Sequence, residues 1–199
     1  TEQWLADESR CVMEGKAFLV RFTTDWTCGL LWNKLYKRAL FDGIFFEEGH
    51  KIDDEYFTYQ GVMNAAKVVC DPRVVYNYRQ RASSVMQSPA ARAQIAVDRI
   101  DFMAKRREKV LERFPELRRE FDISFVDALS YLADYPDNTE ESIRLLKYYA
   151  RRYFLQRGNT FPPRYLLRGI LRVQLTGTKT ILRRSEKNRK PVDTAGLFR

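Results

Sequence analysis

Three helical patterns separated by prolines occupy the second half of the chain and constrain its fold most strongly. Apolar residues recur at helical spacing in three segments, residues 91–114, 121–135 and 140–157. Pro115 and Pro136 separate these segments, and Pro162 and Pro163 follow the last one. Because proline lacks the backbone N–H that continues a helix, each of these prolines marks a boundary. We therefore expect a mainly α-helical C-terminal region.

The first half of the chain mixes helical and β-rich patterns. Helices are expected over three ranges, residues 1–22, 30–40 and from Asp53 onward. Short strands are expected over three others, residues 44–46, 67–70 and 74–78. Gly15 predicts a break in the first helix, residues 41–43 predict a turn, and residues 71–73 predict a hairpin-like turn. The predicted fold class is α/β with few short strands, and the chain is expected to be helix-rich overall.

The composition is that of a globular protein rather than a disordered one, with 45% hydrophobic and 31% charged residues. No apolar run approaches the roughly 20 residues that a membrane-spanning helix needs. The three cysteines, Cys11, Cys28 and Cys70, are odd in number and lack the spacing of a metal site. A reducing compartment fits this pattern, so we expect a cytoplasmic location.

Three short sequence blocks follow one another between Leu31 and Met86. They have the forms W-x-K-L-Y-x-R, F-x-E-G-x-x-x-D-D-E-x-F and Y-R-x-R-x-x-S-x-M. Their positions are held by Trp32, Lys34, Leu35, Tyr36 and Arg38, by Phe46, Glu48, Gly49, Asp53, Asp54, Glu55 and Phe57, and by Tyr78, Arg79, Arg81, Ser84 and Met86. In this order the blocks resemble the acceptor-side half of a family 2 glycosyltransferase. The resemblance covers roughly the first half of the chain.

The donor-side motifs of that family, a nucleotide-binding βαβ unit and a D-x-D sequence that holds a divalent metal, do not occur in this sequence. We therefore expect the back portion of a longer enzyme, inactive by itself. Residues 1–90 would form the acceptor-side half of a GT-A-like domain, residues 91–163 a helical extension, and residues 164–199 a basic amphipathic helix with a disordered tail. The resemblance implies Mn²⁺ or Mg²⁺ in the full-length enzyme, with no metal bound by this portion.

The acidic triplet Asp53-Asp54-Glu55 is the predicted catalytic site. Sugar transfer with inversion needs one carboxylate that takes the proton from the acceptor hydroxyl. By resemblance Asp54 is this base, Asp53 stands where glutamate is commoner, and Glu55 supports them. The alternative is that acidic residues at a helix start only offset the helix dipole, which is worth ~0.3 to 1 kcal/mol.

Two further groups are predicted to bind substrate. In the first group, Trp32, Asn33 and Lys34, an aromatic face can stack on a sugar and a cation can approach a phosphate. In the second group, Arg79, Arg81 and Ser84, the guanidiniums can neutralise the donor diphosphate. Equally open are a buried helix face for Trp32 and a solvated strand end for the arginines. His50, the only histidine, is expected on the rim of the site rather than as a metal ligand.

Basic charge is concentrated at the end of the chain. Residues 151–199 hold 13 Lys and Arg but only two acidic residues, Glu186 and Asp193. Arg164, Arg168 and Arg172 recur at four-residue spacing, with leucines and isoleucine on another face, a pattern typical of a helix on an anionic membrane. Nucleic acid would not need the apolar face, and a helix packed on its own domain stays an alternative.

The resemblance implies a transferase that moves a hexose, with inversion, from a nucleotide-sugar donor to a lipid-linked or cell-surface glycan acceptor. It would be cytoplasmic and peripheral on the inner face of the plasma membrane, with no nucleic-acid partner. The alternative is a non-catalytic helical module that binds a membrane or a nucleic acid, in which the acidic triplet is only a helix cap.

Overall fold

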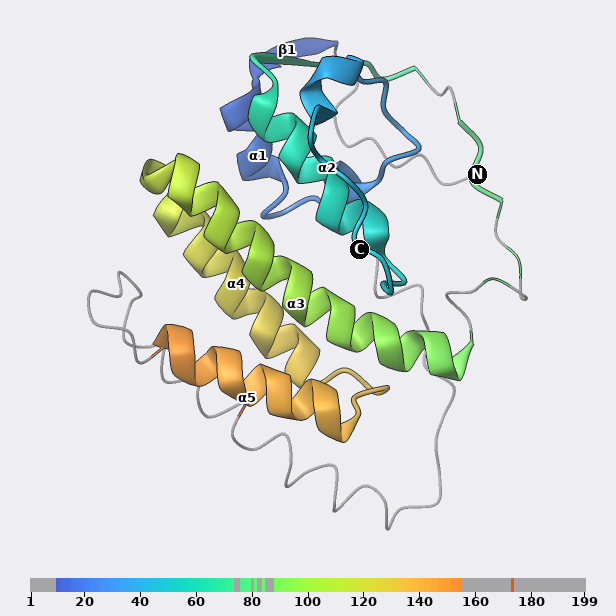
Figure 1. Cartoon of the computed structure of the whole chain (residues 1–199), viewed down its shortest axis with the longest axis vertical. Coiled ribbons are helices and arrows are strands. Elements are labelled where there is room, and N and C mark those ends of the chain that lie inside the picture. Colours follow the sequence, from blue (N-terminus) through green and yellow to red (C-terminus); the bar gives the residue numbers. More distant parts are fainter. Residues whose placement is uncertain are drawn as a thin grey trace.

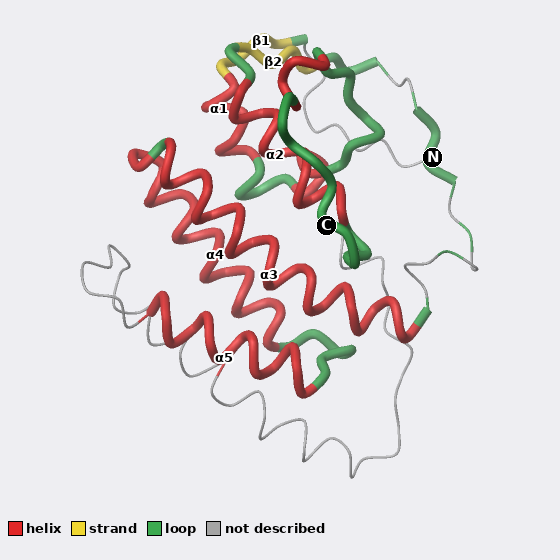
Figure 2. Tube along the Cα trace, viewed as in Figure 1, coloured by secondary structure: helices red, strands yellow, loops and turns green. Residues whose placement is uncertain are grey.

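The computed structural model describes residues 10–73, 76–79, 81, 84, 88–154 and 173. The five α-helices of this part are α1 (Gly15–Arg21), α2 (Asp53–Asn64), α3 (Pro89–Arg113), α4 (Arg118–Ala133) and α5 (Glu140–Phe154). Its strands are β1 (Cys11–Glu14) and β2 (Lys67–Cys70), and its 3₁₀ helices are η1 (Trp26–Gly29), η2 (Arg38–Phe41) and η4 (Pro115–Leu117). Figure 2 shows that helix dominates. The expected helix-rich architecture with few short strands is confirmed.

Helix α3 runs through the middle of the described structure (Figure 1). Helices α1 and α2 and the small sheet lie on one side of it, and α4 and α5 lie on the other. The N-terminus of α3 is capped by Ser88, whose hydroxyl accepts a hydrogen bond from the Ala91 N–H, and Pro89 occupies the first turn. Helix α3 ends at Arg113, before the predicted boundary at Pro115.

The three helices of the second half lie where the sequence predicted them, but the first half differs from its prediction. Residues 11–14, expected to be helical, form β1, which pairs antiparallel with β2 so that Cys11 faces Cys70. Gly15, the expected break, is the first residue of α1. The predicted turn at residues 41–43 is present, with Gly43 at φ 76° and the Ile44 N–H bonded to the Phe41 carbonyl.

Three predicted elements are not found among the described residues of this half. Residues 30–40 form an irregular loop that ends in η2, instead of a helix, and residues 44–46 do not form a strand. In the loop, the Lys34 ammonium donates hydrogen bonds to the carbonyls of Thr27 and Leu30 at 3.0 and 2.6 Å. A helix would give the Leu30 carbonyl to the Lys34 backbone N–H, so the side chain has replaced that bond. Residues 76–79 carry no strand, and β2 pairs with β1 rather than with them.

Hydrophobic side chains form one cluster across α3, α4 and α5, which includes Ile100, Phe125 and Leu146. A second cluster joins α1 and α2 to the C-terminal half of α3, through residues such as Leu19 and Val110. Side chains from both sides of residue 90 therefore share one core, and the domain boundary placed there stays a prediction. Among the described helices, none is long and apolar enough to cross a bilayer.

A buried ion pair joins α3 to α4. The Arg107 guanidinium donates to Oδ1 of Asp122 through Nε at 2.7 Å and also through Nη2, and it lies 4.4 Å from the centroid of the Tyr153 ring of α5. Both charged residues are buried. Removal of one partner would leave the other charge without compensation in a medium of low polarity.

We expect Asp122→Ala to lower the free energy of unfolding by about 3 to 5 kcal/mol, because Arg107 would stay buried without its counter-ion. Urea unfolding followed by circular dichroism measures the loss. The control is Glu116→Ala, which removes the exposed pair between Lys16 and Glu116 and should leave stability nearly unchanged. Equal midpoints for the two variants would contradict this role for the buried pair.

Candidate functional site

The acidic triplet forms the first turn of α2, as predicted. The Asp54 N–H donates to Asp53 Oδ1 at 3.1 Å, and the Glu55 N–H donates to Asp54 Oδ1 at 3.0 Å. Asp53 is exposed, whereas Asp54 and Glu55 are half-buried. The Glu55 N–H also donates to the Ile52 carbonyl at 3.1 Å, so the acidic side chains add to the backbone bonding of this first turn.

Asp54 also contacts the loop that contains Trp32 and Lys34. The Leu31 backbone N–H faces the Asp54 carboxylate and favours its ionised form. Burial raises the pKa of Asp54, the negative charge of Asp53 raises it further, and the backbone N–H donors oppose both effects. A raised pKa makes a carboxylate a better proton acceptor, provided that it is still ionised at the working pH.

Glu55 lies deeper, between α2, η1 and α3. Its side chain is 17% exposed, and its Oε2 lies 3.4 Å from Nη1 of Arg106. A Cβ atom on Gly29 would lie only 2.4 Å from the same oxygen, so a larger residue there would displace the Glu55 carboxylate from its present position. Burial raises the pKa of Glu55 to about 7, and the positive charge of Arg106 opposes this shift.

Lys34 and Asn33 brace the loop beside the triplet. Besides its two carbonyl acceptors, the Lys34 ammonium donates to Oδ1 of Asn33 at 2.6 Å. Burial lowers the pKa of Lys34 to about 8, while the nearby carboxylates and the oxygen atoms around it favour the charged form. All three protons of the ammonium thus have acceptors within the loop, and a phosphate would have to compete with them.

Trp32 belongs to a stack of exposed aromatic rings, not to a buried helix face. Its ring centroid lies 5.1 Å from that of Tyr78, with 12° between the planes, and 4.6 Å from that of Tyr76. The three residues Trp32, Tyr76 and Tyr78 are 39%, 48% and 49% exposed. Folding therefore brings the first and third sequence blocks together and leaves an aromatic surface open to solvent.

The other predicted site residues lie in the third sequence block and in the basic segment at the end of the chain. Arg79 and Arg81 are exposed, and Ser84 is half-buried with its N–H bonded to the Arg81 carbonyl at 3.0 Å. Arg164, Arg168 and Arg172 lie outside the described residues. No group of three His, Cys, Asp or Glu side chains suited to a metal ion occurs in the part of the chain that the structure describes.

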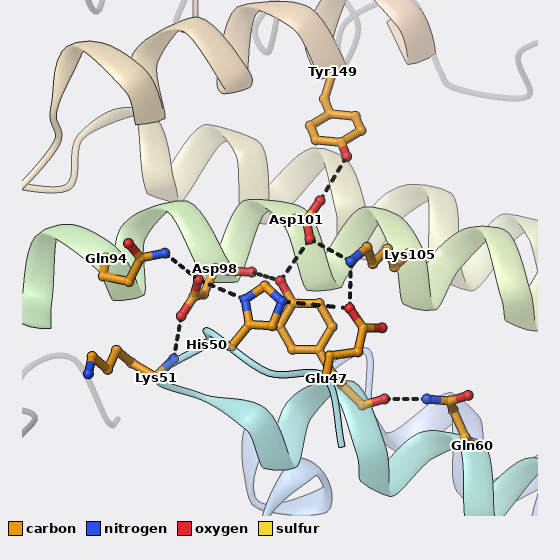
Figure 3. A network of polar contacts seen from close by, with 10 residues as sticks. Glu47, His50, Lys51, Gln60, Gln94, Asp98, Asp101, Lys105 and Tyr149 are labelled. Carbon is orange, nitrogen blue, oxygen red and sulfur yellow. Dashed lines mark hydrogen bonds and ion pairs between the residues drawn. The ribbon is translucent and has the colours of Figure 1, made fainter. Parts of the chain in front are cut away.

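Helix α3 contributes polar residues that were not predicted from the sequence. The Asp98 carboxylate, 1% exposed, accepts hydrogen bonds from the Lys51 N–H at 2.7 Å and from Gln94 at 2.8 Å, and it lies 3.0 Å from Nδ1 of His50 (Figure 3). The Tyr56 hydroxyl donates to Asp101 at 2.9 Å. His50 thus links its loop to α3.

Lys105 extends the same network. Its ammonium lies 2.7 Å from Glu47 and 3.1 Å from Asp101, within the network drawn in Figure 3. Asp98, Asp101 and Lys105 recur at three- and four-residue spacing, which places them on one side of α3. In the sequence, this spacing of charged residues within an amphipathic helix is the feature from which the network could have been predicted.

A hollow of about 410 Å³ lies at the other end of α2, lined by residues that include Lys16, Met63, Asn64 and Arg113. It contains no part of the acidic triplet. We regard the turn at Asp54 as the candidate site, because charge, burial and an exposed aromatic surface meet there.

Comparisons with known proteins add no relative: no family model, no curated protein sequence and no solved structure matches this chain.

The elevated pKa of Glu55 predicts a specific pH dependence of stability. A carboxyl group with a folded-state pKa of about 7, above the ordinary value of 4.5, binds more protons in the folded state between these pH values. Its stabilising contribution is complete below pH 4.5 and is lost as the pH rises through 7. The difference in unfolding free energy between wild type and Glu55→Gln should therefore fall by up to about 3 kcal/mol across this window. Urea titrations at several pH values measure it, and a difference independent of pH would contradict the assignment.

Proposed function

We propose that the chain carries the acceptor-side half of a GT-A-like glycosyltransferase, in which Asp54 is the general base. The observation that carries this proposal is the position of Asp54. Its carboxylate is half-buried at a helix start, has a raised pKa, and faces the loop that presents the exposed Trp32 ring. A base beside an aromatic surface suits an acceptor sugar that must be both stacked and deprotonated.

The reaction proposed is transfer of a hexose with inversion from a nucleotide sugar to a hydroxyl group of a glycan. The acceptor oxygen attacks the anomeric carbon and forms the new C–O bond while its proton passes to Asp54. The bond from the anomeric carbon to the diphosphate oxygen breaks, and its electron pair leaves with the nucleoside diphosphate. Since no described group fits Mn²⁺ or Mg²⁺, we assign no residue and no step of this mechanism to the metal.

The substrate would be held by groups around this base. The rings of Trp32, Tyr76 and Tyr78 offer apolar faces on which a pyranose can stack. Arg79 and Arg81 are exposed on the segment that follows these tyrosines, and their guanidiniums can pair with a diphosphate. Lys34 holds the loop in place through its bonds to the Thr27 and Leu30 carbonyls, so we give it a positioning role.

Asp54→Asn tests the proposal against the alternative of a simple helix cap. Asparagine caps helices about as well as aspartate, so the variant keeps the fold, but an amide cannot accept the proton. In the complete enzyme, with its donor-binding half, we expect turnover to fall by ~10²- to 10⁴-fold. The exposed turn residue Asp42 supplies the control, and Asp42→Asn should retain wild-type turnover.

Product formation from a radiolabelled nucleotide sugar measures these rates. If Asp54→Asn keeps more than about a tenth of wild-type kcat, a barrier change under ~1.4 kcal/mol, then Asp54 is not the base. In that case the non-catalytic module, with the acidic triplet as a cap, becomes the better description.

We further propose that the basic segment of residues 164–184 docks the enzyme on the anionic inner face of the plasma membrane. Support comes from the sequence alone, from the arginines at four-residue spacing and the leucines and isoleucine beside them. A lipid-linked acceptor would then be presented at the surface where the enzyme lies.

Vesicle flotation tests the membrane proposal. Binding should require phosphatidylglycerol and should weaken as salt screens the arginines. Replacement of Arg164, Arg168 and Arg172 by glutamine should cost on the order of 1 kcal/mol for each residue close to the surface. The charge-matched control replaces Lys187, Arg189 and Lys190, outside the amphipathic pattern, and should have less effect. Equal recovery on phosphatidylcholine vesicles would refute the proposal.

A further inference from the structure

Glu55 is the point at which three elements meet. From α3, the Arg106 guanidinium reaches the Glu55 carboxylate at 3.4 Å and the Phe22 carbonyl at 3.5 Å. Arg106 is only 6% exposed, and the rings of Phe22 and Phe102 lie 5.5 and 5.2 Å from the guanidinium carbon. On the other side, Gly29 of η1 lies against the same carboxylate.

Stability alone is a weak explanation for this ion pair. The 3.4 Å between Arg106 Nη1 and Glu55 Oε2 exceeds the roughly 2.7 to 2.9 Å of strong charge-assisted hydrogen bonds. Burial removes both charges from water, and apolar residues of similar volume often stabilise such an interface equally well. The specific effect of the Arg106–Glu55 contact is to restrain the first turn of α2, in which Glu55 is adjacent to Asp54.

A second contact from α3 holds the chain just before that turn. The buried Asp98 carboxylate accepts the Lys51 N–H at 2.7 Å, two residues before Asp53. Figure 3 shows this bond within the network that joins the loop to α3. The segment Asp53-Asp54 is therefore bracketed by two contacts to one helix, Lys51 with Asp98 and Glu55 with Arg106.

We propose that Arg106 is a positioning residue for Asp54: its contact with Glu55 fixes the first turn of α2, and so the direction in which the Asp54 carboxylate points. Asp98 performs the same task from the preceding side. The helical region after residue 90 is then part of the catalytic unit rather than an appendage. The effect of Arg106 on turnover rests on the proposed function, whereas its effect on the position of Asp54 does not.

Amide hydrogen exchange, measured on this 199-residue chain, tests whether Arg106 positions Asp54. The readout is the Leu31 N–H, which faces the Asp54 carboxylate, and the internal reference is the Val62 N–H near the other end of α2. Arg106→Met should accelerate exchange at Leu31 by about tenfold or more without a matching change at Val62. A variant that only destabilised the fold would accelerate both amides together.

Arg113→Met is the matched control. Arg113 also lies on α3 and also reaches α2, but it contacts Asn64 at the far end, at 2.7 Å. It should leave Leu31 exchange unchanged. If Arg106→Met does not fold, Arg106→Lys and Asp98→Asn replace it in the exchange measurement. Lysine keeps the positive charge but lacks the paired N–H donors of the guanidinium, and asparagine keeps one acceptor oxygen for the Lys51 N–H. Both variants should therefore accelerate Leu31 exchange less than Arg106→Met does.

Activity of the complete enzyme separates the two claims. Misplacement of a reacting group costs rate, so Arg106→Met should lower kcat by about tenfold or more with KM little changed, and Arg106→Lys should restore part of the rate. Faster Leu31 exchange with normal kcat would uphold the positioning role and overturn the assignment of Asp54 as base. Leu31 exchange equal to that of Arg113→Met would overturn the proposal itself, whatever the activity.

Discussion

The hold of α3 on the chain around α2 is the constraint on which the candidate site depends. The Asp98 carboxylate is almost fully buried, and it receives the Lys51 N–H, the Gln94 amide and the imidazole of His50. A buried carboxylate without such donors would carry a large desolvation penalty. If the loop before α2 moved away from α3, the buried Asp98 carboxylate would lose its hydrogen-bond donors. This contact therefore also holds the acidic first turn of α2, which follows the loop.

The same helix uses three consecutive basic residues to contact three different elements. Lys105 pairs with Glu47 of the loop, Arg106 with Glu55 of α2, and Arg107 with Asp122 of α4. Successive residues of an α-helix point about 100° apart, so neighbouring side chains leave α3 in different directions. A long central helix can in this way fix several elements at once, while its apolar positions fill the hydrophobic clusters on either side.

The chemistry proposed for Asp54 follows from its intermediate burial. Glu55 is enclosed by Arg106 and Gly29, so it has little room for a substrate, and Asp53 is exposed. Asp54 lies between these extremes, with burial enough to raise its pKa and with the exposed ring of Trp32 on the loop that it contacts. Three adjacent carboxylates thus acquire different properties from their surroundings alone, which is the usual way in which a protein assigns separate roles to identical groups.

The sequence by itself determined the helices of the second half, the start of α2 at Asp53, strand β2 and the turn at Gly43, because each depends on local periodicity, charge or backbone freedom. Only the tertiary structure decided the rest. The Leu30–Leu40 segment has helical spacing, yet the Lys34 side chain takes the carbonyl that a helix would need, and the Trp32 ring lies against Tyr76 and Tyr78 from a distant block. Residues 11–14 form a strand because β2 pairs with them. Asp98 and Arg106 could not be linked to the acidic turn from sequence, since about 45 to 50 residues separate them from their partners and no local pattern records such a contact.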